Sequence, residues 1–313
     1  MNTLTVLAPG LLTTVQDLGR EGFGVIGVSA SGAADALALR IGNKLLGNPE
    51  GAAALEMTLL GGAFQFSEET WSAISGSDFG ATLDGQSLAA HTVFKLQPGQ
   101  TLQFGPTKSG ARAYLCVRGG LDVPKVLGSR STHLLSGLGG FEGRSLRKGD
   151  VLPVGEPADA TPMRKIAEKW LETFSAKKIL GVTEGPQWAS FSGETAKNFL
   201  AQSYIVTEEA NRMGIRLRGT QTPLPSTAEM ISEGVSLGAI QMPSGGQPII
   251  LFVEQQTTGG YPIIANVITA DIASLGQLRP RDEIRFELIG MDDARKLLRE
   301  QESMLTSPEF VEI

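Results

Sequence analysis

Cysteine is almost missing from this chain of 313 residues, in which Cys116 is the only one. A single cysteine excludes an internal disulfide and is typical of a reducing compartment. Aromatic residues make up only 6%, whereas the chain holds 39 glycines and 16 prolines, a balance that predicts many tight turns. No apolar run approaches the length of a membrane span. Because the opening MNTLTVLAPGLL also lacks the basic region of a signal peptide, we expect a cytoplasmic protein.

Basic residues are fewer than acidic ones, and histidine is scarce. The net charge of -6 gives no indication of the basic face that nucleic-acid binding requires. The two histidines, His91 and His133, lie in no pattern typical of a metal ligand or a nucleophile's base, so no metal site is expected. The sequence G-x-x-x-x-G-K-[ST] is absent, which excludes a P-loop for a nucleotide.

What the chain does contain is a long series of short apolar runs broken by glycine and proline. This rhythm predicts a mainly β fold with a few helices, arranged as sandwiches or barrels. Apolar positions spaced every four residues predict a helix over 33–46, with Gly47 as its stop. Further helices are expected at 194–201 and from Asp292 onward.

Three collinear sequence matches indicate an internal duplication. The matched segments are 40–47 with 212–219, 62–66 with 238–242, and 98–104 with 280–286. They predict two related β units joined by a helix. The expected boundaries are a first unit at 1–160, a linker helix at 161–177, a second unit at 178–290, and a C-terminal helix and tail at 291–313.

The strongest candidate for a binding site follows the apolar run 248–253. Its residues are Gln255, Gln256, Thr257, Thr258, Gly259, Gly260 and Tyr261. A second apolar run, 263–268, comes next, so the polar residues are expected at a corner between two strands. Paired glycines let backbone N–H groups approach a ligand, and amide and hydroxyl side chains suit an amide or carboxylate substrate. An ordinary hairpin turn is the alternative.

Three further groups of polar residues are candidates. Arg130, followed by Ser131 and Thr132, offers a guanidinium among hydroxyls that suits a carboxylate or phosphate; the alternative is a loop in which Arg130 pairs with a nearby acid. Asn211 and Arg212 form a second group of possible substrate ligands. Asp17 and Glu56, with Thr257 and Thr258, are the candidate catalytic residues.

Several of these stretches resemble one known family. They are TTVQDLGR (13–20), SGAAD (31–35), ALEMTL (54–59), GSRST (128–132), NRMGIRL (211–217) and QTTGGYP (256–262). They closely resemble the family of the 5-oxoprolinase C subunit (PxpC/KipA), also called allophanate hydrolase subunit 2 or biotin-dependent carboxyltransferase-like. The resemblance extends from Leu4 to about Leu288, with its motifs in order.

The resemblance implies two cyclophilin-like β-barrel domains and a function within a heteromeric complex. It implies a hydrolase that opens 5-oxo-L-proline to L-glutamate with ATP hydrolysis. The partners implied are the A and B subunits of 5-oxoprolinase, of which B is KipI-like, and the ATP is bound with or by a partner. Two alternatives stay open. One is the carboxyltransferase component of a urea or amide carboxylase that uses biotin, and the other is a non-catalytic regulator of a KipI-like partner.

Overall fold

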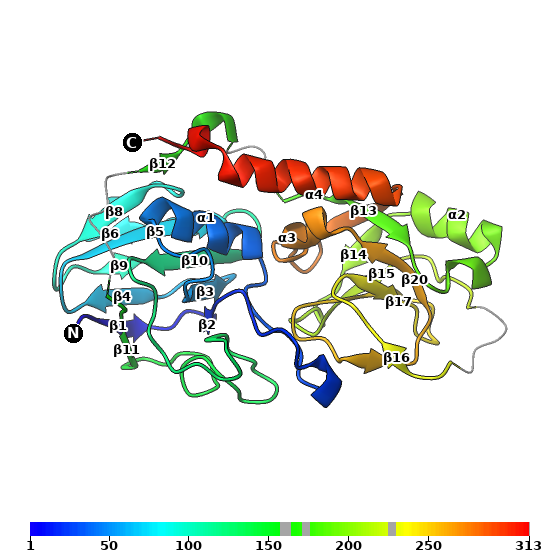
Figure 1. The fold of residues 1–313 in the computed structure, drawn as a ribbon, viewed down its shortest axis with the longest axis horizontal. Coiled ribbons are helices and arrows are strands. Elements are labelled where there is room, and N and C mark those ends of the chain that lie inside the picture. The colour runs from blue at the N-terminus through cyan, green and yellow to red at the C-terminus, as the bar shows by residue number, and fades with distance from the viewer. Residues whose placement is uncertain (157–163, 171–175, 225–229, 313) are drawn as a thin grey trace. The chain divides into compact units, whose positions relative to one another are not determined.

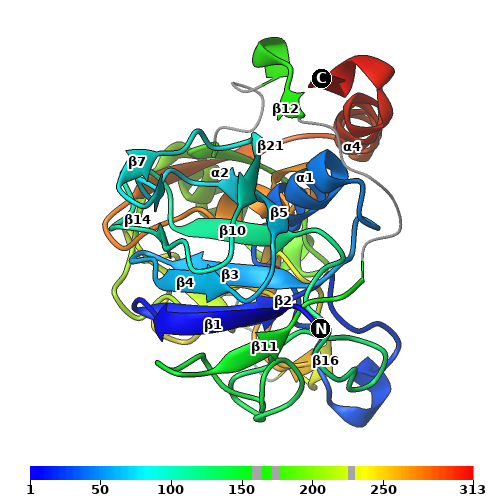
Figure 2. The ribbon, with the colours of Figure 1, turned by 90° about the vertical axis from the view of Figure 1, so that its left-hand side faces the viewer.

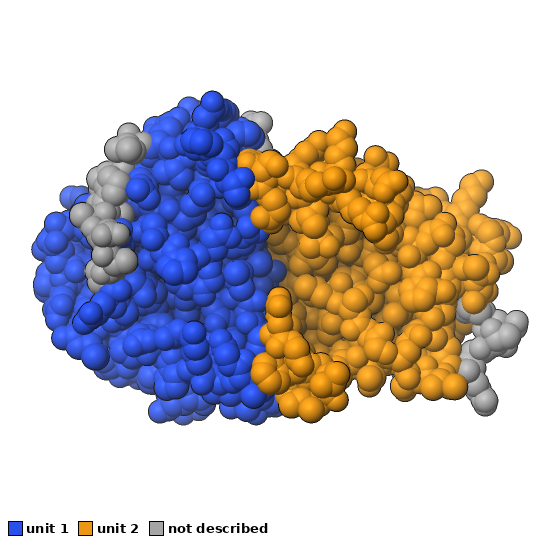
Figure 3. All heavy atoms as spheres, viewed as in Figure 1, with its two compact units in different colours: residues 1–20, 31–175, 305–313 blue, residues 21–30, 176–304 orange. Residues whose placement is uncertain are grey.

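The computed structural model describes residues 1–156, 164–170, 176–224 and 230–312. The chain divides into two compact units, drawn in different colours in Figure 3. Unit 1 comprises Met1–Arg20, Ser31–Ser175 and Leu305–Ile313, and unit 2 comprises Glu21–Ala30 and Ala176–Met304. In the described part of the chain, no helix is both long enough and apolar enough to cross a membrane.

Unit 1 is built on two sheets (Figures 1 and 2). The six-stranded sheet has the order β11-β1-β4-β9-β6-β7, and the five-stranded sheet has the order β2-β3-β10-β5-β8. The strands are β1 (Thr3–Ala8), β2 (Leu12–Gln16), β3 (Ala54–Thr58), β4 (Ala63–Phe66), β5 (Thr70–Gly76), β6 (Thr82–Leu83), β7 (Gln86–Ser87), β8 (Val93–Leu96), β9 (Leu102–Gln103), β10 (Arg112–Val117) and β11 (Val151–Pro153). A separate pair joins β12 (Lys165–Ile166) to β22 (Val311–Glu312), near the short turns η2 (Glu168–Trp170) and η6 (Pro308–Phe310).

The core of unit 1 consists of apolar side chains from both sheets, among them Val6, Phe64, Leu102 and Leu115. Helix α1 (Ala36–Leu46) packs on β5 and β10. It begins at Asp35, whose side chain accepts from Ala38 N, and ends at Gly47 in the left-handed conformation. On the sheet side lies Cys116, where burial raises the pKa of the thiol to about 12 and so keeps it protonated and inert.

Gly42 lets α1 approach the sheet closely. A Cβ at this position would lie 2.5 Å from Cys116 Sγ and 2.7 Å from Ser75 Oγ. Gly42→Ala is therefore expected to lower the free energy of unfolding by about 1–2 kcal/mol, because overpacking outweighs the gain in helix propensity. Gly193→Ala, at the start of another helix with no atom within 4 Å of the added Cβ, is the control and should be neutral or slightly stabilising in the same urea titration. Equal stability of the two variants would contradict the close packing.

Unit 2 contains a closed barrel of seven strands in the order β13-β20-β17-β18-β15-β14-β21. Its strands are β13 (Ile179–Glu184), β14 (Tyr204–Val206), β15 (Gly214–Arg218), β17 (Ala239–Gln241), β18 (Ile249–Leu251), β20 (Ile263–Val267) and β21 (Glu283–Leu288). Outside the barrel, β16 (Glu233–Gly234) pairs with β19 (Thr258–Gly259). Its α-helices are α2 (Gly193–Ala201), α3 (Ile272–Leu275) and α4 (Met291–Thr306), whose last two residues belong to unit 1. Its 3-10 helices are η1 (Gly24–Ile26), η4 (Trp188–Ser190) and η5 (Thr269–Asp271).

Helix α2 seals one side of this barrel through aromatic rings. Phe199 stacks on Phe286 of β21 with ring centroids 5.0 Å apart, and Tyr204 lies against both rings. The Tyr204 hydroxyl donates to Phe199 O at 3.1 Å, so the polar end of the buried tyrosine is satisfied.

The predicted mainly β fold with a few helices is confirmed, as are the helices over 33–46, 194–201 and from Asp292 onward, which correspond to α1, α2 and α4. The expected linker helix at 161–177 lies partly outside the described residues. Within it, residues 164–170 hold β12 and η2.

The duplication is only partly reflected in the structure. Segment 40–47 lies in a helix, whereas its match 212–219 lies in a strand, so this pairing is wrong as a structural equivalence. The other two matches do pair strands, β4 with β17 and β9 with β21. Their neighbours differ, because β4 lies beside β9 while β17 and β21 are not adjacent in the barrel.

Candidate functional site

In unit 1, a carboxylate that directly follows β2 organises a hydrogen-bonded group, here called the Asp17 cluster (Asp17, Ser129, Arg130, Ser131 and Thr132). Asp17 Oδ1 accepts from the hydroxyls of Ser129 and Ser131 at 2.6 and 2.5 Å, and from Gly19 N at 2.8 Å. Asp17 Oδ2 accepts from Arg130 N at 2.6 Å. Asp17 is only 8% exposed, and these four hydrogen bonds compensate the desolvation of its carboxylate. The carboxylate therefore holds the 128–132 loop at the end of β2.

Thr132 continues this attachment along β2. Its backbone N–H and its hydroxyl both donate to Val15 O, at 2.9 and 3.0 Å. Its carbonyl accepts from Gln16 Nε2 at 3.1 Å and from Ser31 Oγ at 2.8 Å. Gly140, with a φ of 57°, covers the threonine so closely that a Cβ would lie 1.9 Å from its hydroxyl. The polar groups predicted near residues 17 and 130 thus form one network.

The guanidinium of Arg130 is already engaged in this structure. Its Nε donates to Val123 O at 2.9 Å, and a terminal nitrogen pairs with the carboxylate of Asp122. This arrangement is the alternative that the sequence left open, in which the arginine pairs with a neighbouring acid.

Glu56 occupies the middle of a sheet, opposite Thr14 of β2 and Tyr114 of β10. Its Oε2 accepts from the Tyr114 hydroxyl at 2.7 Å and from Ala34 N at 2.8 Å, and its Oε1 lies 3.4 Å from Arg112 Nε. Burial first, and then the negative charge of Glu56, raises the pKa of Tyr114 well above its ordinary value, so the hydroxyl remains a donor. A carboxylate that is 1% exposed, hydrogen-bonded through Oε2 and ion-paired through Oε1 fits a structural role in joining strands.

In unit 2, the polar stretch predicted at a corner between two strands, here called the 255–261 segment, has a different topology. The runs on either side form β18 and β20, but both pair with β17, which lies between them in the barrel. The segment therefore crosses the end of β17 and is not a hairpin turn. Within it, Thr258 and Gly259 form β19 and pair with β16.

A set of amide side chains gathers under this segment. Gln256 Nε2 donates to Gln241 Oε1 at 3.2 Å, and Gln241 itself is 2% exposed. A Cβ on Gly259 would lie 2.5 Å from Gln241 Nε2, which is why the close approach needs glycine. Gln187 lies next to this group: it donates to Glu233 Oε1 at 2.7 Å and accepts at 2.9 Å from the N–H of Ile263, which pairs with Gln241.

No local sequence pattern places Gln187 and Gln241 at this site, because strand pairing brings both of them there. Gln241 comes from β17, and Gln187 follows β13. Around them, Gln256, Thr258, Gly260 and the 48% exposed Tyr261 face solvent, while Thr257 is half-buried. The side-chain amide of Gln255 is hydrogen-bonded to backbone groups. In the orientation that satisfies both its oxygen and its nitrogen, it donates to Phe252 O and accepts from Leu237 N.

A buried ion pair anchors the start of the 255–261 segment. Arg212 Nε lies 2.5 Å from Glu254 Oε1, with both side chains less than a tenth exposed, and Glu254 N donates to Arg212 O at 2.8 Å. Asn211 Oδ1 accepts from Met213 N at 2.8 Å, so the asparagine shapes the turn before β15. The predicted ligands Asn211 and Arg212 thus hold backbone and a neighbouring acid.

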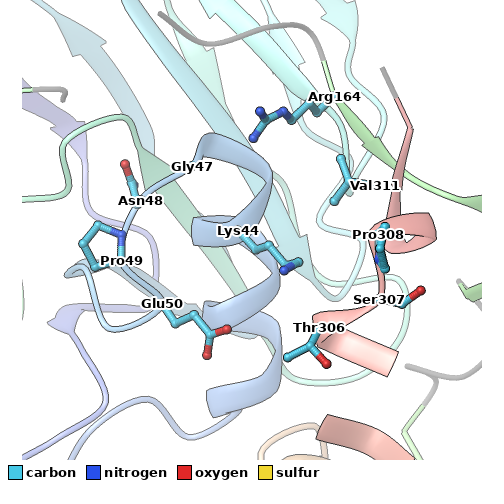
Figure 4. A pocket seen from close by; sticks show the side chains of 10 residues that line it. All are labelled: Lys44, Gly47, Asn48, Pro49, Glu50, Arg164, Thr306, Ser307, Pro308 and Val311. Carbon is cyan, nitrogen blue, oxygen red and sulfur yellow. The ribbon is translucent and has the colours of Figure 1, made fainter. Parts of the chain in front are cut away.

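A groove of unit 1 lined by Lys44, Arg164 and Ser307 contains none of the predicted site residues (Figure 4). Among the described residues, no three histidine, cysteine, aspartate or glutamate side chains gather in a way that would hold a metal ion.

Comparison with known proteins gives the class of this fold. Residues 26–288 match the carboxyltransferase domain, subdomain A and B. The Kluyveromyces lactis urea carboxylase structure superposes with a TM-score of 0.92 at 33% identity over 99% of the chain, which spans 30% of that larger chain. The protein therefore belongs to the carboxyltransferase domain family.

Two relatives narrow this class. The chain is 37% identical to the C subunit of the Haemophilus influenzae 5-oxoprolinase over 93% of both chains. It is also 37% identical to the C subunit of the Escherichia coli 5-oxoprolinase, over 96% of this chain and 95% of the relative. The predicted resemblance to the C subunit of 5-oxoprolinase is confirmed.

Proposed function

We propose that this protein is the C subunit of an ATP-dependent 5-oxoprolinase and acts in the cytoplasm with separate A and B subunits, the latter KipI-like. The observation that carries the proposal is the match in length, because the two relatives from 5-oxoprolinases are covered almost end to end. The complex would convert 5-oxo-L-proline, ATP and two molecules of water to L-glutamate, ADP and phosphate.

The chemistry requires that a lactam carbonyl be polarised while its N–H and carboxylate are held in place. We place this task at the 255–261 segment, because hydroxyl and amide donors there face solvent beside a rigid barrel end. Thr258 and Gln256 would donate to the substrate, and Tyr261 would cover it. The Asp17 cluster would support a loop, since its carboxylate and the guanidinium of Arg130 already have partners.

We propose that ATP is bound with or by a partner subunit. The chain has no P-loop sequence, so a nucleotide would not be held by a P-loop of this subunit. In this chain the residues of the 255–261 segment would orient the lactam only.

A second candidate function is the carboxyltransferase step of an amide or urea carboxylase, with biotin carried on another chain. The structural match to the urea carboxylase supports it. The same donors would then bind a urea or amide carbonyl, so only the substrate and the partner distinguish the two functions.

The decisive experiment is 5-oxoproline-dependent ADP release by the chain co-purified with its A and B partners. We expect release to vanish when this chain is omitted, and Thr258→Ala to lower turnover by about a hundredfold through loss of one donor to the carbonyl. Thr220→Ala, which removes another exposed threonine of the same unit, is the control.

Normal turnover by the Thr258 variant would refute the site, whereas a formed complex that is silent with 5-oxoproline would refute the function. In that case, transfer of carboxyl from carboxybiotin to urea would establish the second candidate. Inactivity on both substrates would leave binding of the KipI-like partner as the role of the chain.

A further inference from the structure

The groove of unit 1 lies between the C-terminal end of α1 and the last residues of the chain (Figure 4). Its volume is about 610 Å³, which is within the range of small-molecule sites. Lys44 comes from the last turn of α1, Arg164 precedes β12, and Ser307 follows α4. Three separate parts of the sequence therefore bring polar side chains to one cavity.

The groove is positively charged although the chain as a whole carries a net charge of -6. Among the described residues, neither Lys44 nor Arg164 forms an ion pair. The one acid of the lining, Glu50, forms an ion pair with Arg40, whose Nε lies 2.7 Å from its Oε2. Lys44 and Arg164 thus line the cavity, and among the described residues no acid forms an ion pair with either.

These cations are not needed to satisfy the end of helix α1. The backbone N–H of Gly47 donates to Asn43 O and Lys44 O, and Arg118 Nη1 donates to Leu46 O at 2.8 Å. Because the last carbonyls already have donors, Lys44 and Arg164 remain available to a ligand.

The walls of the groove are held firmly. Phe310 is fully buried, and Lys44 Nζ lies 5.9 Å from the centre of its ring. The chain beside Arg164 is fixed by pairing of β12 with β22, in which Lys165 lies opposite Glu312. On the other side, Asn48 Nδ2 donates to Val117 O at 2.7 Å. Strand pairing on one side and a side-chain hydrogen bond on the other thus hold the backbone around the cavity.

We propose that this groove binds the phosphate group of a small molecule, either free phosphate or the phosphate of a nucleotide. A phosphate monoester carries a charge of about -1.5 to -2, which matches the two cations better than a single carboxylate does. Ser307 Oγ accepts from Glu309 N at 3.2 Å, which leaves its hydroxyl hydrogen to donate to a phosphate oxygen. This inference stands apart from the proposed function and uses none of the residues assigned to it.

The test is calorimetric titration of the full chain with inorganic phosphate, with ADP and with L-glutamate, at constant ionic strength in chloride. Lys44→Met and Arg164→Gln keep most of the side-chain bulk and remove the charge. Each is expected to weaken binding of phosphate or ADP by about tenfold or more. Lys95→Met is the matched control, because Lys95 Nζ also lies over a ring, that of Trp71 at 5.2 Å, outside the groove.

Comparable binding of phosphate and ADP would support a site for free phosphate, and tighter binding of ADP would support a nucleotide site. The proposal is overturned if neither ligand binds the wild-type chain at about 10 mM, if L-glutamate binds as tightly, or if both groove variants bind like the control. Thermal unfolding without ligand checks that each variant is folded.

Discussion

Asp17→Ala is expected to lower the free energy of unfolding of unit 1 by about 3–4 kcal/mol. The substitution removes a carboxylate that accepts four hydrogen bonds, two from serine hydroxyls and two from backbone N–H groups. The two serine hydroxyls are fully buried, so they bear most of the desolvation cost when the carboxylate is lost, whereas Gly19 N and Arg130 N are only partly buried. Amide hydrogen exchange would show the loss in residues 128–132 and β2, with peptides of unit 2 as the internal reference.

Asp122→Ala is the control for this variant. Asp122 also interacts with the Asp17 cluster, through the side chain of Arg130, but its own side chain is 56% exposed. We expect a change of about 0.5 kcal/mol or less, as for other exposed ion pairs. A stable Asp17→Ala protein whose assembled enzyme is inactive would instead identify Asp17 as a catalytic residue.

Glu254→Ala is expected to lower the free energy of unfolding by about 3–5 kcal/mol, because it removes a buried carboxylate 2.5 Å from the guanidinium of Arg212, which stays buried. Both side chains of the pair are almost fully enclosed, at 6% and 3% exposed. Since Glu254 directly precedes the 255–261 segment, exchange in that segment should rise along with the loss of stability. Urea unfolding of the variant, with exchange measured in parallel, checks both effects.

A second variant separates the buried charge from general damage. Arg212→Met with Glu254→Leu removes both charges and should recover most of the stability lost in Glu254→Ala. Glu209→Ala, which removes an acid that is 77% exposed, should have almost no effect. If the double variant is no more stable than Glu254→Ala, packing around the pair, and not its charge, is what matters.

The features that the sequence predicts best are those that depend on residues close together in the chain. Helix α1 was predicted from apolar positions spaced every four residues and from Gly47 at its end, which act within a few residues. The expected start at residue 33 was three residues early, because Asp35 caps the helix. The strands on either side of the 255–261 segment were likewise predicted from continuous apolar runs, and they correspond to β18 and β20.

Long-range pairing was beyond local patterns. Residues 248–268 contain no local pattern that predicts β17 between β18 and β20. The polar segment was therefore expected at a corner between two neighbouring strands. In the same way, Asp17 and Ser131 are separated by 114 residues yet share a hydrogen bond. The side chains Gln187 and Gln241 reach the candidate site by such pairings, which a periodic pattern does not encode.

The order in which unit 1 is assembled has a consequence for biosynthesis. Its residues come from the beginning, the middle and the end of the chain, and the fully buried Phe310 belongs to the last of these parts. On the ribosome, unit 2 emerges completely before the strand pair β12–β22 can close. Because Phe310 lies next to β22 in the sequence, its burial in unit 1 also has to wait for this pairing, which forms only after unit 2 has been synthesised.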